Sequence, residues 1–268
     1  MIEATGLAYR VAATTLLTGV TLMVQPGEFV VVVGPNGAGK TTLLKLLAGD
    51  LRPSEGEVRL NGRPLDRYTH DDLAQQRSVF IQQTERDIPF TVRAVVAMGR
   101  YPHRHDASNS LVTDQEAIDR ALTRTETYHL ADRVFATLSS GEQTRVALAR
   151  VFAQEAPLLL LDEPTTSLDL GHEERLVAGL RGLASEGRAV LAVLHDLNAA
   201  ARHATRVVVV DHGELRADGT PVDVFDDGLL SSVYDQPMRV VKHPLVDSPL
   251  VLVVNHELRS RRGDVLGG

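Results

Sequence analysis

Residues 34–41 read GPNGAGKT, and this stretch decides the fold because it matches the pattern G-x-x-x-x-G-K-[ST]. It follows Phe29–Val33, an apolar and mostly β-branched run that predicts a strand buried on both faces. Lys40–Ala48 comes next, and its leucines together with Gly49 predict a helix and its end. A glycine-rich loop between a strand and a helix is typical of a phosphate-binding loop, and an accidental match would not bring both flanking elements with it.

The residue types in this loop suit a nucleoside triphosphate. Its glycines let the backbone curl so that successive N–H groups point at one anion. Lys40 adds a positive charge toward the β- and γ-phosphates, and the Thr41 hydroxyl can bind Mg²⁺. The residues expected to hold the nucleotide phosphates are Asn36, Gly37, Ala38, Gly39, Lys40, Thr41 and Thr42.

The composition narrows the class of protein. Asp and Glu number 35 against 28 Lys and Arg, so the chain lacks the basic surface that coats nucleic acid. It contains no cysteine, which excludes disulfides, thiolate zinc sites and cysteine nucleophiles. Its apolar runs are far shorter than the roughly 20 residues of a membrane-spanning helix, and no secretion signal is visible. We therefore expect a globular protein of the cytoplasm.

Short apolar runs alternate with helical stretches along the chain, which predicts an α/β fold with a mostly parallel sheet. Gly56–Leu60 followed by Asn61-Gly62 predicts a strand entering a tight hairpin, and this adds an antiparallel β edge. Further strands are expected at Leu158–Leu161, Ala189–Leu194 and Val207–Val210, with helices at Glu173–Ala184 and Leu197–Arg202.

Residues 84–153 differ from the rest because helical periodicity dominates there. Helices are expected at Thr91–Met98, Thr113–Thr127 and Ser140–Ala153. In the C-terminal extension, residues 226–268, two short strands are expected at Arg239–Val241 and Leu250–Val254, and the last dozen residues are expected to fray. The prediction is one domain over residues 1–268, with an inserted helical subdomain and a C-terminal extension.

Two carboxylates follow the predicted strand Leu158–Leu161, at the edge where open α/β sheets bind ligands. Asp162 can hold Mg²⁺ through its water shell, and Glu163 can polarise the water that attacks the γ-phosphate. His195 follows another strand at the corresponding edge. The structural alternatives are that Asp162 and Glu163 only form an acidic loop after the strand, and that His195 is an ordinary surface residue. The phosphate loop upstream favours a functional role for these residues.

Leu138–Glu142 precedes a predicted helix, with Ser139 or Ser140 as its cap. Together with the phosphate loop, the Asp162-Glu163 pair and His195, in this order, it resembles the ATP-binding subunit of ABC transporters over roughly residues 1–225. The resemblance implies two copies arranged head to tail, with two ATP molecules buried between each phosphate loop and the other copy's Leu138–Glu142 segment. Hydrolysis of ATP would reopen the dimer and drive motion in a membrane partner.

The resemblance also implies roles for residues of one copy's own nucleotide site. Tyr9 would stack on adenine. Gln82, or the adjacent Gln83, would bind the metal together with Thr41 and Asp162 and join that site to the helical subdomain. The residues with implied catalytic roles are Lys40, Gln82, Glu163 and His195, the last as the switch that contacts the γ-phosphate.

Other implied roles concern the second copy. Ser139 and Gly141 would face the γ-phosphate that the other subunit holds, and Ser167–Asp169 would touch that subunit, so Asp169 also belongs to the predicted site. The family signature most often reads Ser-Gly-Gly-Gln, whereas this chain has serine at position 140 and glutamate at position 142. Glu142 brings a negative charge near the place expected for phosphate.

The region of residues 84–105 is where family members receive the coupling helix of a permease. Ile88–Val92 and Met98–Arg100 resemble importers for iron siderophores, cobalamin and heme, and residues 240–244 and 249–251 resemble heme-import ATPases. The first hypothesis is thus an ATPase subunit at the cytoplasmic face of the membrane, which energises heme uptake through a separate permease and, indirectly, a substrate-binding protein.

Other functions stay open as alternatives. Siderophore or cobalamin import is the nearest one, and another class of ABC transporter comes next. A non-transport ABC protein that acts on ribosomes or DNA is disfavoured, because this chain has one phosphate loop and no sustained heptads. A phosphotransferase outside the family would lack the Leu138–Glu142 segment.

Overall fold

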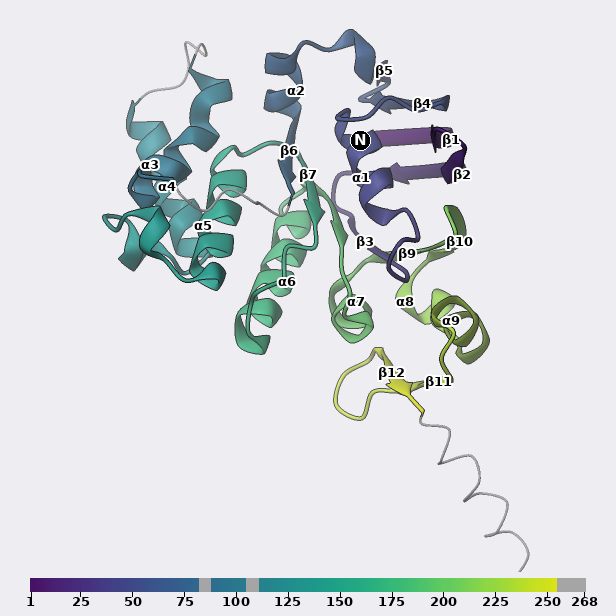
Figure 1. Cartoon of the computed structure of the whole chain (residues 1–268). Coiled ribbons are helices and arrows are strands. Elements are labelled where there is room, and N and C mark those ends of the chain that lie inside the picture. Colours follow the sequence, from purple (N-terminus) through teal and green to yellow (C-terminus); the bar gives the residue numbers. More distant parts are fainter. Residues whose placement is uncertain (82–87, 105–110, 255–268) are drawn as a thin grey trace, which may run out of the picture.

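The computed structural model describes residues 1–81, 88–104 and 111–254, and it contains a central parallel sheet beside a smaller antiparallel one (Figure 1). The central sheet has the strand order β10-β9-β3-β8-β7-β6. Its strands are β3 (Phe29–Val33), β6 (Arg77–Phe80), β7 (Leu158–Asp162), β8 (Ala189–Val193), β9 (Arg206–Asp211) and β10 (Glu214–Gly219). All neighbours are parallel except β10, which pairs antiparallel with β9. The predicted α/β class with a mostly parallel sheet is confirmed.

The antiparallel part of the fold is a sheet of its own with the order β2-β1-β4-β5. Its strands are β1 (Ile2–Val11), β2 (Thr14–Val24), β4 (Glu55–Leu60) and β5 (Arg63–Pro64). Asn61 and Gly62 have φ angles of 50° and 77°, which forms the tight turn predicted between β4 and β5. The sequence pattern predicts this turn but not the extent of the sheet, in which β1 pairs with both β2 and β4.

The strand β3 lies between two hydrophobic clusters. Val30 and Val32 pack with helix α1 (Lys40–Ala48) and the antiparallel sheet, whereas Val31 and Val33 pack toward the helices on the other face. Every residue of β3 is buried, as is every residue of β7 and β8. This two-sided burial is the reason why these strands are continuous apolar runs rather than alternating ones.

The helices on the far side of the sheet are α6 (Leu170–Ser185) and α7 (Leu197–His203). Those beyond the edge strand β6 form a helical lobe, seen at the left of Figure 1: α3 (Val92–Ala97), α4 (Leu111–Arg124) and α5 (Ser140–Ala153). Three short 3₁₀ helices also belong to it, at Met98–His103, Tyr128–Leu130 and Phe135–Thr137. That residues 84–153 act as a separate subdomain stays a prediction.

Some helix ends differ from the prediction for local reasons. α6 begins three residues early because Asp169 caps it through the His172 N–H. α4 ends at Arg124 rather than at residue 127, since Glu126 adopts a left-handed φ of 55°. The helix α2 (His70–Gln76), capped by Thr69, was not predicted, nor was the 3₁₀ helix Leu65–Arg67 before it.

The C-terminal part adds α8 (Pro221–Val224), α9 (Asp227–Tyr234) and a hairpin of β11 (Met238–Lys242) and β12 (Pro249–Val253). Both strands of this hairpin were predicted, with ends that shift by one residue. Figure 1 shows the hairpin below α7 and beside α9. The expected fraying of the last dozen residues lies outside the described residues. Of the helices in the described ranges, none is long and apolar enough to span a membrane.

Candidate functional site

The phosphate loop connects β3 to α1 and is held by close backbone contacts. Lys40 is 6% exposed, and its Nζ donates hydrogen bonds to the carbonyl oxygens of Gly34 (2.7 Å) and Pro35 (2.8 Å). A Cβ at Gly34 would lie 2.0 Å from the Val210 carbonyl oxygen, so only glycine fits there. Gly39 has a φ of 102° and would clash in the same way with β2. The sequence pattern therefore folds into a curled loop pressed against the sheet.

The electrostatics of this loop suit an anion. Burial lowers the pKa of Lys40, and the nearby carboxylates of Glu163 and Asp162 partly oppose that change. Among the described residues, no side chain caps the N-terminus of α1, and its first turn contains no acidic residue. The free N–H groups and the positive end of the helix dipole therefore face the loop, where a phosphate would satisfy them.

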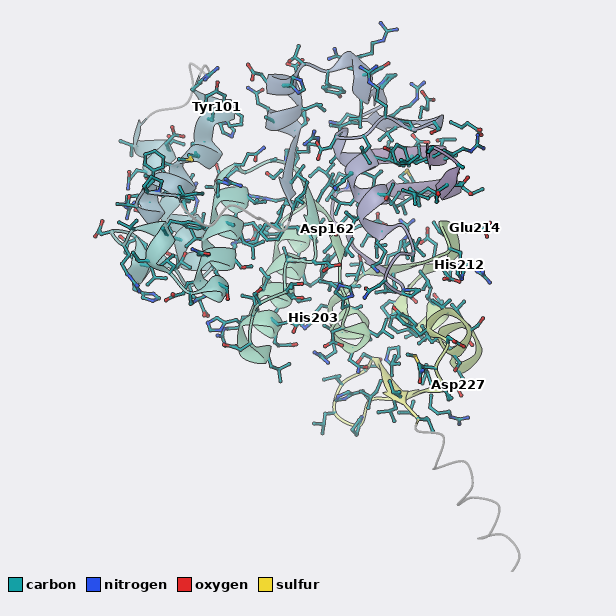
Figure 2. All side chains as sticks on the ribbon, in the orientation of Figure 1. Tyr101, Asp162, His203, His212, Glu214 and Asp227 are labelled. Carbon is teal, nitrogen blue, oxygen red and sulfur yellow. The ribbon has the colours of Figure 1, made fainter. Side chains whose placement is uncertain are left out.

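Thr41 and Asp162 form the candidate metal site. The Thr41 hydroxyl donates to Asp162 Oδ1 at 3.2 Å, and Asp162 lies at the end of β7 near the middle of the molecule (Figure 2). Burial raises the pKa of Asp162, and the neighbouring Glu163 charge raises it further. The Thr41 hydrogen bond and the charges of Lys45 and Lys40 oppose this rise in part. A hydroxyl and a carboxylate are the hard oxygen ligands that Mg²⁺ prefers, so these two residues fit that ion.

The described ranges contain no group of three or more His, Cys, Asp or Glu side chains that could hold a metal ion by themselves. Mg²⁺ usually keeps several waters and takes phosphate oxygens as further ligands. The pair formed by Thr41 and Asp162 thus fits a metal that arrives with a nucleotide, rather than a resident metal centre. The third predicted ligand, Gln82, lies outside the described residues, as does the alternative Gln83.

Glu163 and His195 are in direct contact. Glu163 Oε1 lies 2.7 Å from His195 Nε2, although the two residues follow different strands. Glu163 has a left-handed φ of 49°, and its N–H donates to the Val193 carbonyl at the end of β8. A left-handed glutamate is unfavourable by itself and persists where surrounding contacts hold it. The local backbone thus turns the Glu163 carboxylate away from the buried strand toward His195.

The start of α5 forms the signature segment. Ser139 is the N-cap: its hydroxyl accepts from the Glu142 N–H, and Glu142 Oε2 accepts from the Ser139 N–H and hydroxyl, both at 2.8 Å. These bonds lower the pKa of Glu142 and hold its charge against the cap. A Cβ at Gly141 would lie 3.0 Å from the Ser167 carbonyl oxygen. The segment therefore packs on the 167–169 loop.

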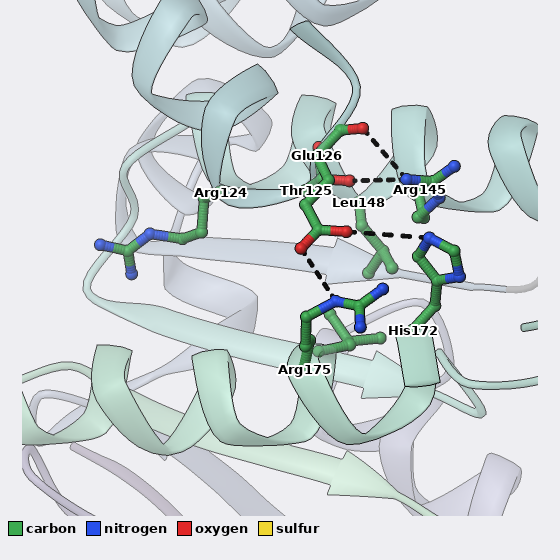
Figure 3. A pocket seen from close by; sticks show the side chains of 8 residues that line it. Arg124, Thr125, Glu126, Arg145, Leu148, His172 and Arg175 are labelled. Atoms are coloured by element: carbon green, nitrogen blue, oxygen red, sulfur yellow. Dashed lines mark hydrogen bonds and ion pairs between the residues drawn. The ribbon is translucent and has the colours of Figure 1, made fainter. Parts of the chain in front are cut away.

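The 167–169 loop is tied to the helical lobe through charged side chains. Asp169 Oδ2 lies 2.7 Å from His172 Nδ1, and His172 Nε2 lies 3.7 Å from Glu126 Oε2. Glu126 Oε1 also pairs with Arg175 Nε at 2.8 Å, beside a pocket of about 30 Å³ (Figure 3). Arg145 donates to the Glu126 carbonyl, which completes the junction. Sequence reasoning missed Glu126 and His172, whose partners come from distant segments.

The structure brings five predicted residues into one site: Lys40, Thr41, Asp162, Glu163 and His195. Tyr9 lies half-buried on β1 against the second hydrophobic cluster, and its role toward adenine stays a prediction. Ser139 and Gly141 lie elsewhere, at the start of α5 in the helical lobe, whereas α1 and its loop lie beside the antiparallel sheet (Figure 1). In one copy of the chain, the phosphate loop and the Ser139–Gly141 segment therefore lie apart.

Comparisons with known proteins agree with this geometry. The sequence profile of the ABC transporter family matches residues 17–166. The hemin import ATP-binding protein HmuV of Streptomyces coelicolor is 47% identical over 92% of this chain and 88% of its own length. The protein of the same name from Nocardia farcinica is also 47% identical, over 91% of this chain and 84% of its own length.

Solved structures share the fold. The chain matches a metal-chelate type ABC transporter in an inward-facing conformation with a TM-score of 0.80 and 25% identity, over 96% of this chain and 98% of that one. It also matches an ATP-binding cassette solved as a dimer with ADP and phosphate, with a TM-score of 0.73 and 28% identity, over 82% of this chain and 98% of that one. The chain belongs to the ABC transporter family, as one of its ATP-hydrolysing subunits.

Proposed function

We propose that this chain is the ATPase subunit of a heme importer and works through a separate permease at the cytoplasmic face of the membrane. The observation that carries the proposal is the identity of 47% with hemin import ATP-binding proteins over nearly the whole chain. The site supports the ATPase half of the proposal, because a phosphate loop, two carboxylates and a histidine meet at one edge of the sheet.

The nucleotide is ATP, bound with Mg²⁺. Lys40 and the free N–H groups of the phosphate loop would hold the β- and γ-phosphates. The phosphate oxygens would then take the place of the Gly34 and Pro35 carbonyl oxygens as hydrogen-bond acceptors for Lys40 Nζ. Thr41, Asp162 and Gln82 would hold the metal, which supplies positive charge against the phosphate oxygens. Tyr9 would stack on adenine. The buried position of Asp162 beside the Thr41 hydroxyl supports the metal assignment.

Glu163 is proposed as the general base. Its Oε1 is engaged by His195, so Oε2 is the oxygen left to accept a proton from the attacking water. The Thr166 hydroxyl lies 3.5 Å from Oε2, at the limit of a hydrogen bond, and can orient that oxygen. His195 would hold the Glu163 carboxylate in place and reach toward the γ-phosphate. Both side chains are partly exposed, 27% for Glu163 and 46% for His195, so a water and a phosphate can approach the pair from outside.

Two copies arranged head to tail would complete the site. The N-terminus of α5, a helix of 14 residues that Ser139 caps, would approach the γ-phosphate. Its own phosphate loop is not in contact with it, so the nucleotide of the second copy is the expected partner. The Asp169 loop packs beside it. The related cassette solved as a dimer with ADP and phosphate supports this arrangement.

The permease would dock on the helical lobe. Phe90, Met98 and Tyr101 are 51%, 44% and 55% exposed, so large apolar side chains are available on this lobe for a partner. They lie in or beside the region of residues 84–105 that the sequence analysis assigned to this contact, and Figure 2 shows Tyr101 on the outer part of the lobe. A substrate-binding protein would act on the permease and not on this chain.

A second candidate substrate class is a metal chelate such as an iron siderophore, or cobalamin. The observation that favours it is the structural match to a metal-chelate type ABC transporter with a TM-score of 0.80. No heme-contacting residue is expected in this chain, since the cargo crosses the permease. A transport assay is therefore needed to distinguish heme from a siderophore as the substrate.

The test is to capture the native permease through a tag on this chain, reconstitute the complex in vesicles and measure uptake. ATP-dependent heme uptake that Glu163→Gln abolishes is the expected result. Uptake of a ferric siderophore or of cobalamin in place of heme would overturn the heme assignment and leave the ATPase role intact. A complex without any ATP-dependent uptake would contradict the importer.

A further inference from the structure

The side chain of Asn198 joins α7 to the C-terminal hairpin in an unusual way. Its Nδ2 donates to the Val251 carbonyl oxygen at 3.1 Å, and its Oδ1 accepts from the Val251 N–H at 2.8 Å. One side-chain amide thus satisfies both backbone groups of a residue in β12, as a neighbouring strand would. Val251 is 7% exposed and belongs to the main hydrophobic cluster, so this pair is partly shielded from water.

The same residue is tied to the start of α7. The Asn198 N–H donates to Asp196 Oδ1 at 2.7 Å, and this bond caps the helix. Asp196 directly follows His195, whose imidazole lies 2.7 Å from Glu163. α7 has only seven residues, so it has little helical stability of its own and depends on its tertiary contacts. The orientation of His195 therefore depends on what holds Asn198.

The hairpin is itself anchored to the body of the protein. The Val240 N–H donates to Asp227 Oδ1 at 2.6 Å, and the Met238 N–H donates to the Ser231 hydroxyl at 2.9 Å. Both acceptors lie on α9, which Figure 2 places beside the hairpin through the Asp227 label. The last residue of α9, Tyr234, lies near enough to the backbone of Gly34 in the phosphate loop for that backbone to oppose part of the rise that burial causes in the pKa of its phenol. The extension thus contacts the helix that follows His195 and reaches the neighbourhood of the phosphate loop.

Packing supports the same conclusion. Leu230, Val233, Met238 and Val251 belong to one hydrophobic cluster with residues of α7, such as Ala200 and Ala201. Tyr234 is itself largely enclosed, and burial raises the pKa of its phenol to about 12. These four side chains therefore anchor the C-terminal extension to the main hydrophobic core.

We propose that residues 226–254 form a brace for the nucleotide site, and that Asn198 is a positioning residue that fixes His195 through β12. The proposal rests on the role given to His195 under the proposed function. The C-terminal extension thus contributes to ATP hydrolysis by holding His195 in position. The effect runs from Val251 through Asn198 and the cap of α7 to the contact between His195 and Glu163.

The test uses the full chain with Asn198→Ala, and steady-state hydrolysis separates kcat from the KM for ATP. We expect kcat to fall about tenfold, as a modest misplacement of a catalytic group would cause, with KM unchanged within about twofold. The control is Lys242→Ala on the same hairpin, whose side chain is exposed and pairs only with Asp247 among the described residues. It should leave both constants unchanged.

Hydrogen exchange supplies a readout that does not depend on activity. Asn198→Ala should speed exchange in a peptide covering residues 195–203, while peptides from α1 and α6 stay as protected as in the parent chain. A uniform loss of protection, or a rise in KM parallel to the fall in kcat, would show general destabilisation and overturn the proposal. Unchanged exchange at residues 195–203 would also overturn it.

A third variant keeps the two proposals separate. Single-turnover hydrolysis with His195→Ala measures what His195 itself contributes, and Asn198→Ala should add no further loss in that background. If His195→Ala leaves the rate unchanged, the role of His195 fails, and the exchange result still decides whether the extension braces α7. An equal loss from Asn198→Ala in both backgrounds would contradict its action through His195.

Discussion

Thr41 Oγ1 and Asp162 Oδ1 lie 3.2 Å apart, although 121 residues separate them in the chain. Thr41 lies in the first turn of the helix after the phosphate loop, and Asp162 ends the strand that precedes Glu163, the proposed general base. Asp162 and the candidate base Glu163 are consecutive residues, so this contact places the candidate metal site directly beside the base. The predictions below test the chemistry that this arrangement supports.

Glu163→Gln should reduce ATP hydrolysis by roughly 10²-fold or more and leave ATP affinity largely intact. The amide keeps the shape of the side chain and its contact with His195, but it cannot accept the proton of the attacking water. Steady-state hydrolysis and ATP titration measure the two effects. Glu116→Gln, on the exposed face of α4, is the matched control. Near-normal turnover in Glu163→Gln would remove this residue from its role.

Lys40→Ala should weaken ATP binding by at least about tenfold, because the loop loses the only full charge it directs at the β- and γ-phosphates. Calorimetric titration of the variant with ATP and Mg²⁺ measures the change. Lys242→Ala removes an equal charge from the exposed hairpin and should bind ATP like the parent chain. Equal affinities for all three proteins would count against the phosphate cradle.

A mixture of Lys40→Ala and Ser139→Arg chains should recover part of the hydrolysis that each variant loses by itself. In a head-to-tail pair, the intact phosphate loop of one chain meets the intact α5 N-terminus of the other, which restores one site. Activity is measured against the mixing ratio and compared with each variant alone. Absence of any recovered activity would argue against a site shared between two copies.

Gly34→Ala should lower the free energy of unfolding by roughly 2–3 kcal/mol and abolish ATP binding, since its Cβ would lie 2.0 Å from a carbonyl of β9. Gly37→Ala meets no atom within 4 Å and should cost only about 1 kcal/mol for its positive φ. Urea unfolding of the two variants measures the contrast. Equal losses of stability would show that the close approach to β9 does not matter.

Asp162→Asn should stabilise the nucleotide-free protein at neutral pH. Burial raises the pKa of Asp162 above the ordinary 3.8, so the folded state binds the proton more tightly than the unfolded state. Stability is then lost as the pH rises through the raised pKa, and this loss is absent in the amide. Thermal unfolding between pH 4 and 7 should show the advantage of Asp162→Asn growing with pH. An advantage that shrinks as the pH rises would contradict the sign.

Local patterns predicted the parts of the fold that local interactions determine. The phosphate loop, α1 and the ends of α5 were predicted correctly, because glycine spacing, a serine cap and leucine periodicity are properties of short segments. α2 was not predicted, and α4 ends earlier than its periodicity suggests. There the outcome depends on a capping box and on one left-handed glutamate, which are weak signals in a single sequence.

The same distinction between local and long-range interactions applies to the candidate site. The sequence placed Asp162, Glu163 and His195 at strand ends, and from this their meeting at one edge could be expected. It could not indicate that Glu126 would pair with Arg175 or that Asn198 would hold β12. Both contacts join segments from different regions of the chain, so no local spacing predicts them.

The amino-acid sequence by itself determined the chemistry of this protein: which residues can bind phosphate and metal, and in which order they occur along the chain. Only the tertiary structure decided which of them meet, because parallel strands brought the ends of β7 and β8 together and packing placed the C-terminal hairpin against α7. The physical reason is that residue type sets the interaction a side chain can make, whereas burial and backbone pairing set its partner.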